Sequence, residues 1–169
     1  MRNILPFFLL AILFACNDAN NSEGTNDDDT AAAQSATTDT AASSAPMSKT
    51  ALPLTPDQEV PTNNSTAKGT ADVNYNPQTK MLSFTVNYEG LTGKPTMAHI
   101  HGTAPRGSNA GVVHDLTGKL QKEVKGSFSD SVRVEGNIKE DSLLSGFYYF
   151  NIHTPKHPAG EIRGQIELR

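Results

Sequence analysis

Alternation of apolar and polar side chains is the main pattern in the second part of the chain. It is clearest in residues 81–88 (MLSFTVNY), where every second side chain is apolar. Strict alternation over this length predicts a strand with one buried face. Residues 67–75 repeat the pattern, and the turn-forming residues 76–79 (NPQT) separate the two. We therefore expect a β-hairpin.

Further short strands are expected after the hairpin. Asp130 interrupts the alternation of one of them, which predicts an irregularity there. Residues 139–145 (KEDSLLS) have helical character, and Gly146 would end a helix of one or two turns. Seven or eight strands with turns at regular spacing predict an all-β chain folded as a single antiparallel β-sandwich. The strands after the hairpin are expected at residues 96–101, 112–116, 124–134, 147–153 and 161–168.

The N-terminus has a different character. Arg2 precedes an apolar run over residues 4–15, and 12 residues are too few to span a bilayer as a helix. Such a run is typical of a secretory signal peptide. It ends in LFAC, which resembles the bacterial lipobox, in which the chain is cleaved before a cysteine that is then lipidated. We expect residues 1–15 to be a lipoprotein signal peptide and Cys16 to be lipidated; the alternative is an ordinary signal peptide with an incidental thiol.

Residues 16–51 are rich in Ala, Ser, Thr and Asn and nearly devoid of large apolar side chains. Such a segment cannot bury enough surface to offset the entropy of ordering it, which predicts a disordered tether. The folded domain is then expected over residues 52–169. This organisation predicts a location in the bacterial cell envelope, with the protein attached to the membrane through its lipid anchor.

Charge and cysteine content exclude two further possibilities. The net charge of −4 arises before residue 54, because residues 1–53 carry two basic and six acidic side chains. The rest of the chain is neutral and has no clustered basic face, so we expect no binding to nucleic acid. Cys16 is the only cysteine, and the fold is therefore held by its core without an intramolecular disulfide.

Three histidines stand out on the predicted strands. His99 and His101 are two apart, so they share one strand face, while Ile100 points to the other, core-facing side. His153 ends a second apolar strand. Imidazole suits copper and zinc, and ligands sharing one ion would bring the ring nitrogens within about 5 Å of one another. The sequence predicts a copper or zinc site at His99, His101 and His153, with His157 and His114 as candidate extra ligands.

The alternative is that these rings only hydrogen-bond to loops. Asn151, Glu161 and Arg163 would then complete a polar outer face of the sheet. Glu161 and Arg163 are two apart on the last strand and have two interpretations. In the first, they form an exposed ion pair worth about 0–1 kcal/mol. In the second, they and Asn151 lie next to the histidines and orient them, with Glu161 as an acidic partner for a histidine N–H.

Several motifs together resemble the CHRD domain, first described in chordin and present in many bacterial secreted proteins. They are AHIHGTA at residues 98–104, GVV at 111–113, NIHT at 151–154 and PAGEIRGQI at 158–166, with QEVP at 58–61 fitting the start of the domain. The resemblance covers nearly all of the expected domain. It implies a secreted β-domain and identifies the domain more firmly than an activity.

A second, looser resemblance concerns the histidines alone. A His-x-His strand followed much later by a strand ending in His is similar to the copper half of Cu/Zn superoxide dismutase, which is itself a β-sandwich. The resemblance implies copper ligation by His99, His101 and His153 only, since the chain has five histidines in all. The expected sandwich is accordingly an immunoglobulin-like or superoxide-dismutase-like Greek key.

Two functions follow from these patterns. The first is a non-catalytic, extracytoplasmic module that binds a protein or ligand of unknown identity. The second is a copper- or zinc-binding protein, either with or without redox activity. No catalytic residues are assigned, because the sequence contains no nucleophile motif and no pair of carboxylates that a cleft would bring together.

Overall fold

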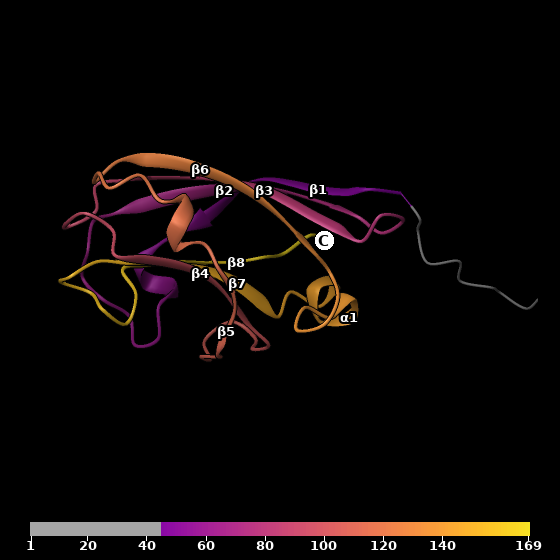
Figure 1. Ribbon diagram of the computed structural model, residues 1–169. Coiled ribbons are helices and arrows are strands. Elements are labelled where there is room, and N and C mark those ends of the chain that lie inside the picture. The colour runs from indigo at the N-terminus through magenta and orange to yellow at the C-terminus, as the bar shows by residue number, and fades with distance from the viewer. Residues whose placement is uncertain (1–44) are drawn as a thin grey trace, which may run out of the picture. The chain divides into compact units, whose positions relative to one another are not determined.

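Two antiparallel four-stranded sheets lie face to face in the domain (Figure 1). The computed structural model describes residues 45–169. The first sheet has the order β1-β2-β3-β6, from β1 (Met47–Leu54), β2 (Lys68–Asn76), β3 (Met81–Glu89) and β6 (Gly126–Arg133). The second has the order β5-β4-β7-β8, from β4 (Met97–Gly102), β5 (Val112–Asp115), β7 (Tyr148–His153) and β8 (Ile162–Gln165). The predicted all-β sandwich is confirmed.

The remaining elements are short. Helix α1 (Glu140–Leu144) lies where helical character was expected, and two 3-10 turns, η1 (Pro56–Gln58) and η2 (Thr117–Lys119), occur in the connections. In residues 45–169, no helix is long and apolar enough to cross a membrane. The predicted signal peptide, Cys16 and most of the predicted tether lie outside the described residues.

The predicted hairpin forms the centre of the first sheet. Strands β2 and β3 pair without a break from Lys68 opposite Glu89 to Asn76 opposite Met81. Their apolar positions face the second sheet, where the ring centroids of Phe84 and Phe150 lie 4.9 Å apart. The alternation in the sequence therefore arises because one face of the hairpin packs against the second sheet.

Strand β1 begins earlier than the sequence predicted. It starts at Met47, whereas the tether was expected to reach residue 51. Met47 pairs with Tyr75 and Lys49 with Val73, and a register shift follows before Leu52. Pairing with β2 thus orders this segment although its side chains are largely exposed. The pattern of apolar residues therefore does not reveal where β1 begins.

Asp130 is not the irregularity that the sequence predicted. Strand β6 pairs with β3 without a register shift, and Asp130 lies opposite Phe84, so its carboxylate points toward the interior. There Asp130 is 3.3 Å from the Nε2 atom of His114 and 3.1 Å from the Nζ atom of Lys119. These partners on β5 and η2 satisfy a carboxylate at a core-facing position, which explains why a charged residue occurs within a regular strand.

The outer face of the second sheet differs most from expectation. Its polar side chains were expected to be at least partly exposed, yet Glu161 and Arg163 are 0% and 1% exposed. Loops cover them: Asn63 donates to the carbonyls of Gly160 and Glu161, and Asn109 contacts Arg163. The interpretation of Glu161 and Arg163 as an exposed ion pair is therefore wrong. This sheet has an apolar layer on one side and a buried polar layer on the other.

Candidate metal centre

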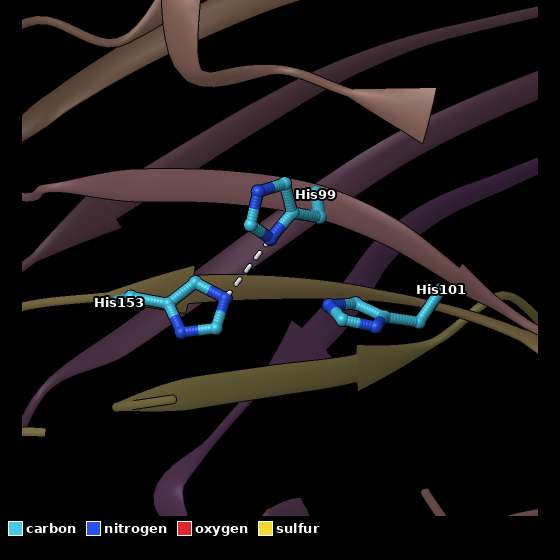
Figure 2. Close-up of side chains that lie close together, drawn as sticks. All are labelled: His99, His101 and His153. Carbon is cyan, nitrogen blue, oxygen red and sulfur yellow. Dashed lines mark hydrogen bonds between the residues drawn. The ribbon is translucent and has the colours of Figure 1, made fainter. Parts of the chain in front are cut away.

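The three predicted histidines converge in the buried polar layer (Figure 2). His99 and His101 come from one face of β4, and His153 comes from the end of the neighbouring strand β7. One ring nitrogen from each lies within 4.8 Å of the others. The expected approach to within about 5 Å is confirmed, because the strand alternation and the β4–β7 register together place all three on the same face.

Two of the rings are oriented by backbone carbonyls. The Nδ1 atom of His101 is 3.0 Å from the carbonyl oxygen of Ala110, and that of His153 is 3.0 Å from the carbonyl oxygen of Pro158. A carbonyl only accepts hydrogen bonds, so each Nδ1 carries the proton and each Nε2 presents a lone pair. The Nε2 atom of His101 is buried and has no partner among the described residues.

The third ring has a different environment. The Nδ1 atom of His99 is 3.1 Å from the Nε2 atom of His153. Since that Nε2 is unprotonated, Nδ1 of His99 must be the donor in this pair. The Nε2 atom of His99 points the other way, 3.8 Å from a carboxylate oxygen of Asp115. The atoms that face the common centre are therefore Nδ1 of His99 and Nε2 of the other two rings.

Burial favours the neutral form of all three rings. Desolvation lowers the pKa of all three, and it lowers that of His153 to about 4. For His99, the nearby charge of Asp115 opposes this effect on the pKa. Neutral imidazoles with free lone pairs are the form that binds a metal ion, whereas a protonated ring cannot.

Tyr149 and Arg163 hold one side of the site. The ring of Tyr149 stacks on His101 with centroids 4.9 Å apart and planes 4° from parallel. The Arg163 guanidinium lies 3.5 Å above the centroid of the Tyr149 ring. The Tyr149 hydroxyl accepts a hydrogen bond from the backbone N–H of Ala110, the residue whose carbonyl orients His101. Arg163 therefore supports His101 through Tyr149 and makes no ion pair with Glu161.

Asn151 and Glu59 form another wall. Asn151 lies opposite His99 on the neighbouring strand, and its Nδ2 donates to an oxygen of Glu59 at 2.7 Å. A Cβ atom on Gly160 would collide with that Nδ2 and with the Glu59 carboxylate, so only glycine fits beside the pair. Burial raises the pKa of Glu59 from 4.5 to about 8, although the charge of Arg163 acts in the opposite direction. Glu59 was overlooked as a site residue; the QEVP segment that contains it was the available signal.

Glu161 stabilises the loops around the site, and its carboxylate hydrogen-bonds to these loops rather than to a histidine. Its carboxylate accepts hydrogen bonds from the hydroxyls of Ser65 and Thr154, both at 2.6 Å, and from the backbone N–H of Thr92 at 2.8 Å. These donors come from three separate segments of the chain. Glu161 thus holds in place the loops that cover the polar layer. Its effect on the histidines is less direct than the sequence predicted.

The two possible extra ligands do not join the three rings. His114 faces the interior and pairs with Asp130. His157 lies in the loop after β7, where its backbone N–H bonds to Thr154. Neither belongs to the group of mutually close ligand atoms. Asp115 was not predicted at all, because its position opposite His99 depends on the β4–β5 register.

These features define a β-sandwich domain with a group of three converging histidines, of which His153 is buried and the other two are half-buried. The family model of the CHRD domain matches residues 50–166, and the chain belongs to this family. Comparison with curated proteins and with solved structures gave no match.

Proposed function

We propose that this CHRD domain binds one copper or zinc ion through His99, His101 and His153. The observation that carries the proposal is the orientation of the rings. Carbonyls hold the protons of His101 and His153 on Nδ1, and the free Nε2 lone pairs face the same centre as Nδ1 of His99. Hydrogen bonding through the second ring nitrogen is the usual way in which proteins orient histidine ligands.

Simple hydrogen bonding among the rings explains this arrangement less well. It accounts for the contact between His99 and His153 but leaves Nε2 of His101 buried without a partner among the described residues. An unsatisfied buried polar atom costs about 1–3 kcal/mol. A metal ion would satisfy this atom and the other two at once. Three imidazoles also leave a coordination position for a further ligand, which is compatible with either a binding or a redox role.

Metal titration of the full chain tests the proposal. The protein is prepared without a histidine tag and with Cys16→Ser, which removes the only thiol as a competing ligand. We expect one equivalent of Cu²⁺ or Zn²⁺ per chain by calorimetry and by metal analysis after dialysis. Absence of a stoichiometric site for both ions would refute the proposal and leave the second candidate function, a non-catalytic interaction module, which the CHRD family match favours.

We further propose that the domain is attached to the bacterial cell envelope through lipidated Cys16. The support is the sequence LFAC after an apolar run of signal-peptide length. In this arrangement the domain would act outside the cytoplasm, at a distance from the membrane set by the segment before β1.

Replacing Cys16 with serine is expected to move the protein from the membrane fraction to the soluble fraction, because a serine cannot carry the lipid. Fractionation of cells that express the wild type and Cys16→Ser measures this. Equal membrane association of the two proteins would contradict the lipid anchor.

A further inference from the structure

The three histidines do not present the same nitrogen to the centre. His101 and His153 turn Nε2 inward, and neutral carbonyls bind their Nδ1 protons. His99 turns Nδ1 inward, and its Nε2 lies 3.8 Å from the carboxylate of Asp115. One ligand of the proposed site is thus paired with a negative charge, while the other two are paired with neutral groups.

The backbone holds Asp115 in this position. Asp115 pairs directly with His99 across strands β5 and β4. The same carboxylate oxygen that faces His99 accepts a hydrogen bond from the backbone N–H of Thr117 at 2.8 Å. The turn after β5 therefore fixes the carboxylate beside the ring, although the side chain of Asp115 is 69% exposed.

Without metal, the ring proton of His99 is on the nitrogen that faces away from Asp115, which makes the interaction with the Asp115 carboxylate unfavourable. Nδ1 of His99 must carry the proton, because it donates to the free Nε2 of His153. In the neutral ring this leaves a lone pair on Nε2 facing the carboxylate of Asp115. Two electron-rich groups then point at each other across 3.8 Å.

Metal binding removes this unfavourable interaction. With an ion held at Nδ1 of His99, the proton at Nδ1 would pass to water and Nε2 would take up a proton from water. The ring stays neutral, and its new N–H points at the Asp115 carboxylate. Asp115 therefore favours the metal-bound tautomer of His99 and disfavours the metal-free one, and such a difference appears as affinity for the ion.

We propose that Asp115 is a positioning residue that makes His99 bind metal through Nδ1 and strengthens the binding. This inference rests on the proposed function. Partners that bind the second nitrogen of a histidine ligand typically change metal affinity by about 10–100-fold. Because Asp115 is largely exposed and its charge is screened by water, we expect an effect of about 10-fold.

The test compares Asp115→Asn with Asp141→Asn, both in the full-length Cys16→Ser protein with Zn²⁺ as the probe. The asparagine introduced by Asp115→Asn keeps an oxygen for the Thr117 N–H, and its amide can donate to the free Nε2 of metal-free His99. Asp141 is exposed on α1, so Asp141→Asn removes the same charge elsewhere. Competition with a chromophoric chelator should give about 10-fold weaker zinc binding for Asp115→Asn and a change of less than about 2-fold for Asp141→Asn.

A second readout reports the bonded nitrogen directly. Long-range ¹H–¹⁵N spectra of the zinc-loaded Cys16→Ser protein should show His99 bound through Nδ1 and His101 and His153 bound through Nε2. Binding of His99 through Nε2, or equal affinities of the two aspartate variants, would overturn the role of Asp115. If the Cys16→Ser parent itself binds no zinc, the proposed zinc site fails, and this inference falls with it. Matching thermal unfolding of the metal-free variants checks that both are folded.

Discussion

Replacing His101 with alanine is expected to weaken copper and zinc binding by at least about 100-fold. The substitution removes one of three ligands, whereas loss of an outer partner alone already costs up to about 100-fold. The effect should be measured by chelator competition in the full-length Cys16→Ser protein. Alanine also loses the hydrogen bond to Ala110 and the stacking on Tyr149, so the metal-free domain should become less stable by about 1–2 kcal/mol.

His157→Ala is the matched control for this experiment. His157 also has a buried Nε2 without a partner among the described residues, but it lies outside the group of three rings. Its removal should change the affinity by less than about 2-fold if only the three converging rings bind the ion. Equal losses in both variants would indicate that the metal is held elsewhere, or that both substitutions act through a general disturbance of the outer face.

The fold could be predicted well where packing between the sheets determines the sequence. The alternation in β2 and β3 is strict because one face of the hairpin is buried against the second sheet. Strand β1 was only partly predicted, because its first residues are held by backbone pairing to β2 and their side chains carry no pattern. Asp130 led to a wrong prediction for the opposite reason: a charged residue broke the pattern while the strand stayed regular.

The histidine group was predictable because only two facts are needed for it. Alternation puts His99 and His101 on one face, and pairing of the two apolar strands brings His153 beside them. The partners of these rings were not predictable in the same way. Ala110 and Pro158 contribute backbone carbonyls, which no residue type reveals, and Asp115 reaches His99 only through the register of β5.

The buried polar layer was missed because alternation alone cannot identify it. Polar residues on one face of a strand normally indicate contact with water. Here loops cover that face, and the loop residues that do so are themselves polar. Asn63 and Ser65, for example, bond to the backbone carbonyl and the carboxylate of Glu161, just before β8. Arg163, for example, occupies a position that the alternation assigns to the surface, yet it is buried as deeply as a core residue.

The largest expected effect of pH concerns Glu59 in this layer. Glu59 is 5% exposed, and burial raises its pKa from 4.5 to about 8, with the charge of Arg163 opposing the rise. Between these two pH values the folded state holds a proton that the unfolded state releases. The contribution of Glu59 to stability is therefore present in full below about pH 4.5 and is lost as the pH rises through about 8.

Glu59→Gln isolates this contribution. Glutamine keeps the oxygen that accepts the hydrogen bond from Asn151 and does not titrate. We expect the wild type to lose about 2 kcal/mol of unfolding free energy relative to Glu59→Gln between about pH 6.5 and pH 9. Denaturant unfolding of both metal-free proteins across this range, with a chelator present, measures the difference. The titrating histidines are common to both proteins, so their effects cancel in the comparison.

The pH dependence of this stability difference also shows whether burial or the charge of Arg163 controls the ionisation of Glu59. If burial dominates, Glu59 is neutral below about pH 8 and the two stability curves diverge as the pH rises. If the attraction of Arg163 dominates, Glu59 is ionised throughout, and the curves run parallel over the whole range. In that second case the buried layer contains a charge pair across Asn151, and Glu59→Gln should destabilise the domain equally at every pH, because it leaves Arg163 buried without a compensating charge.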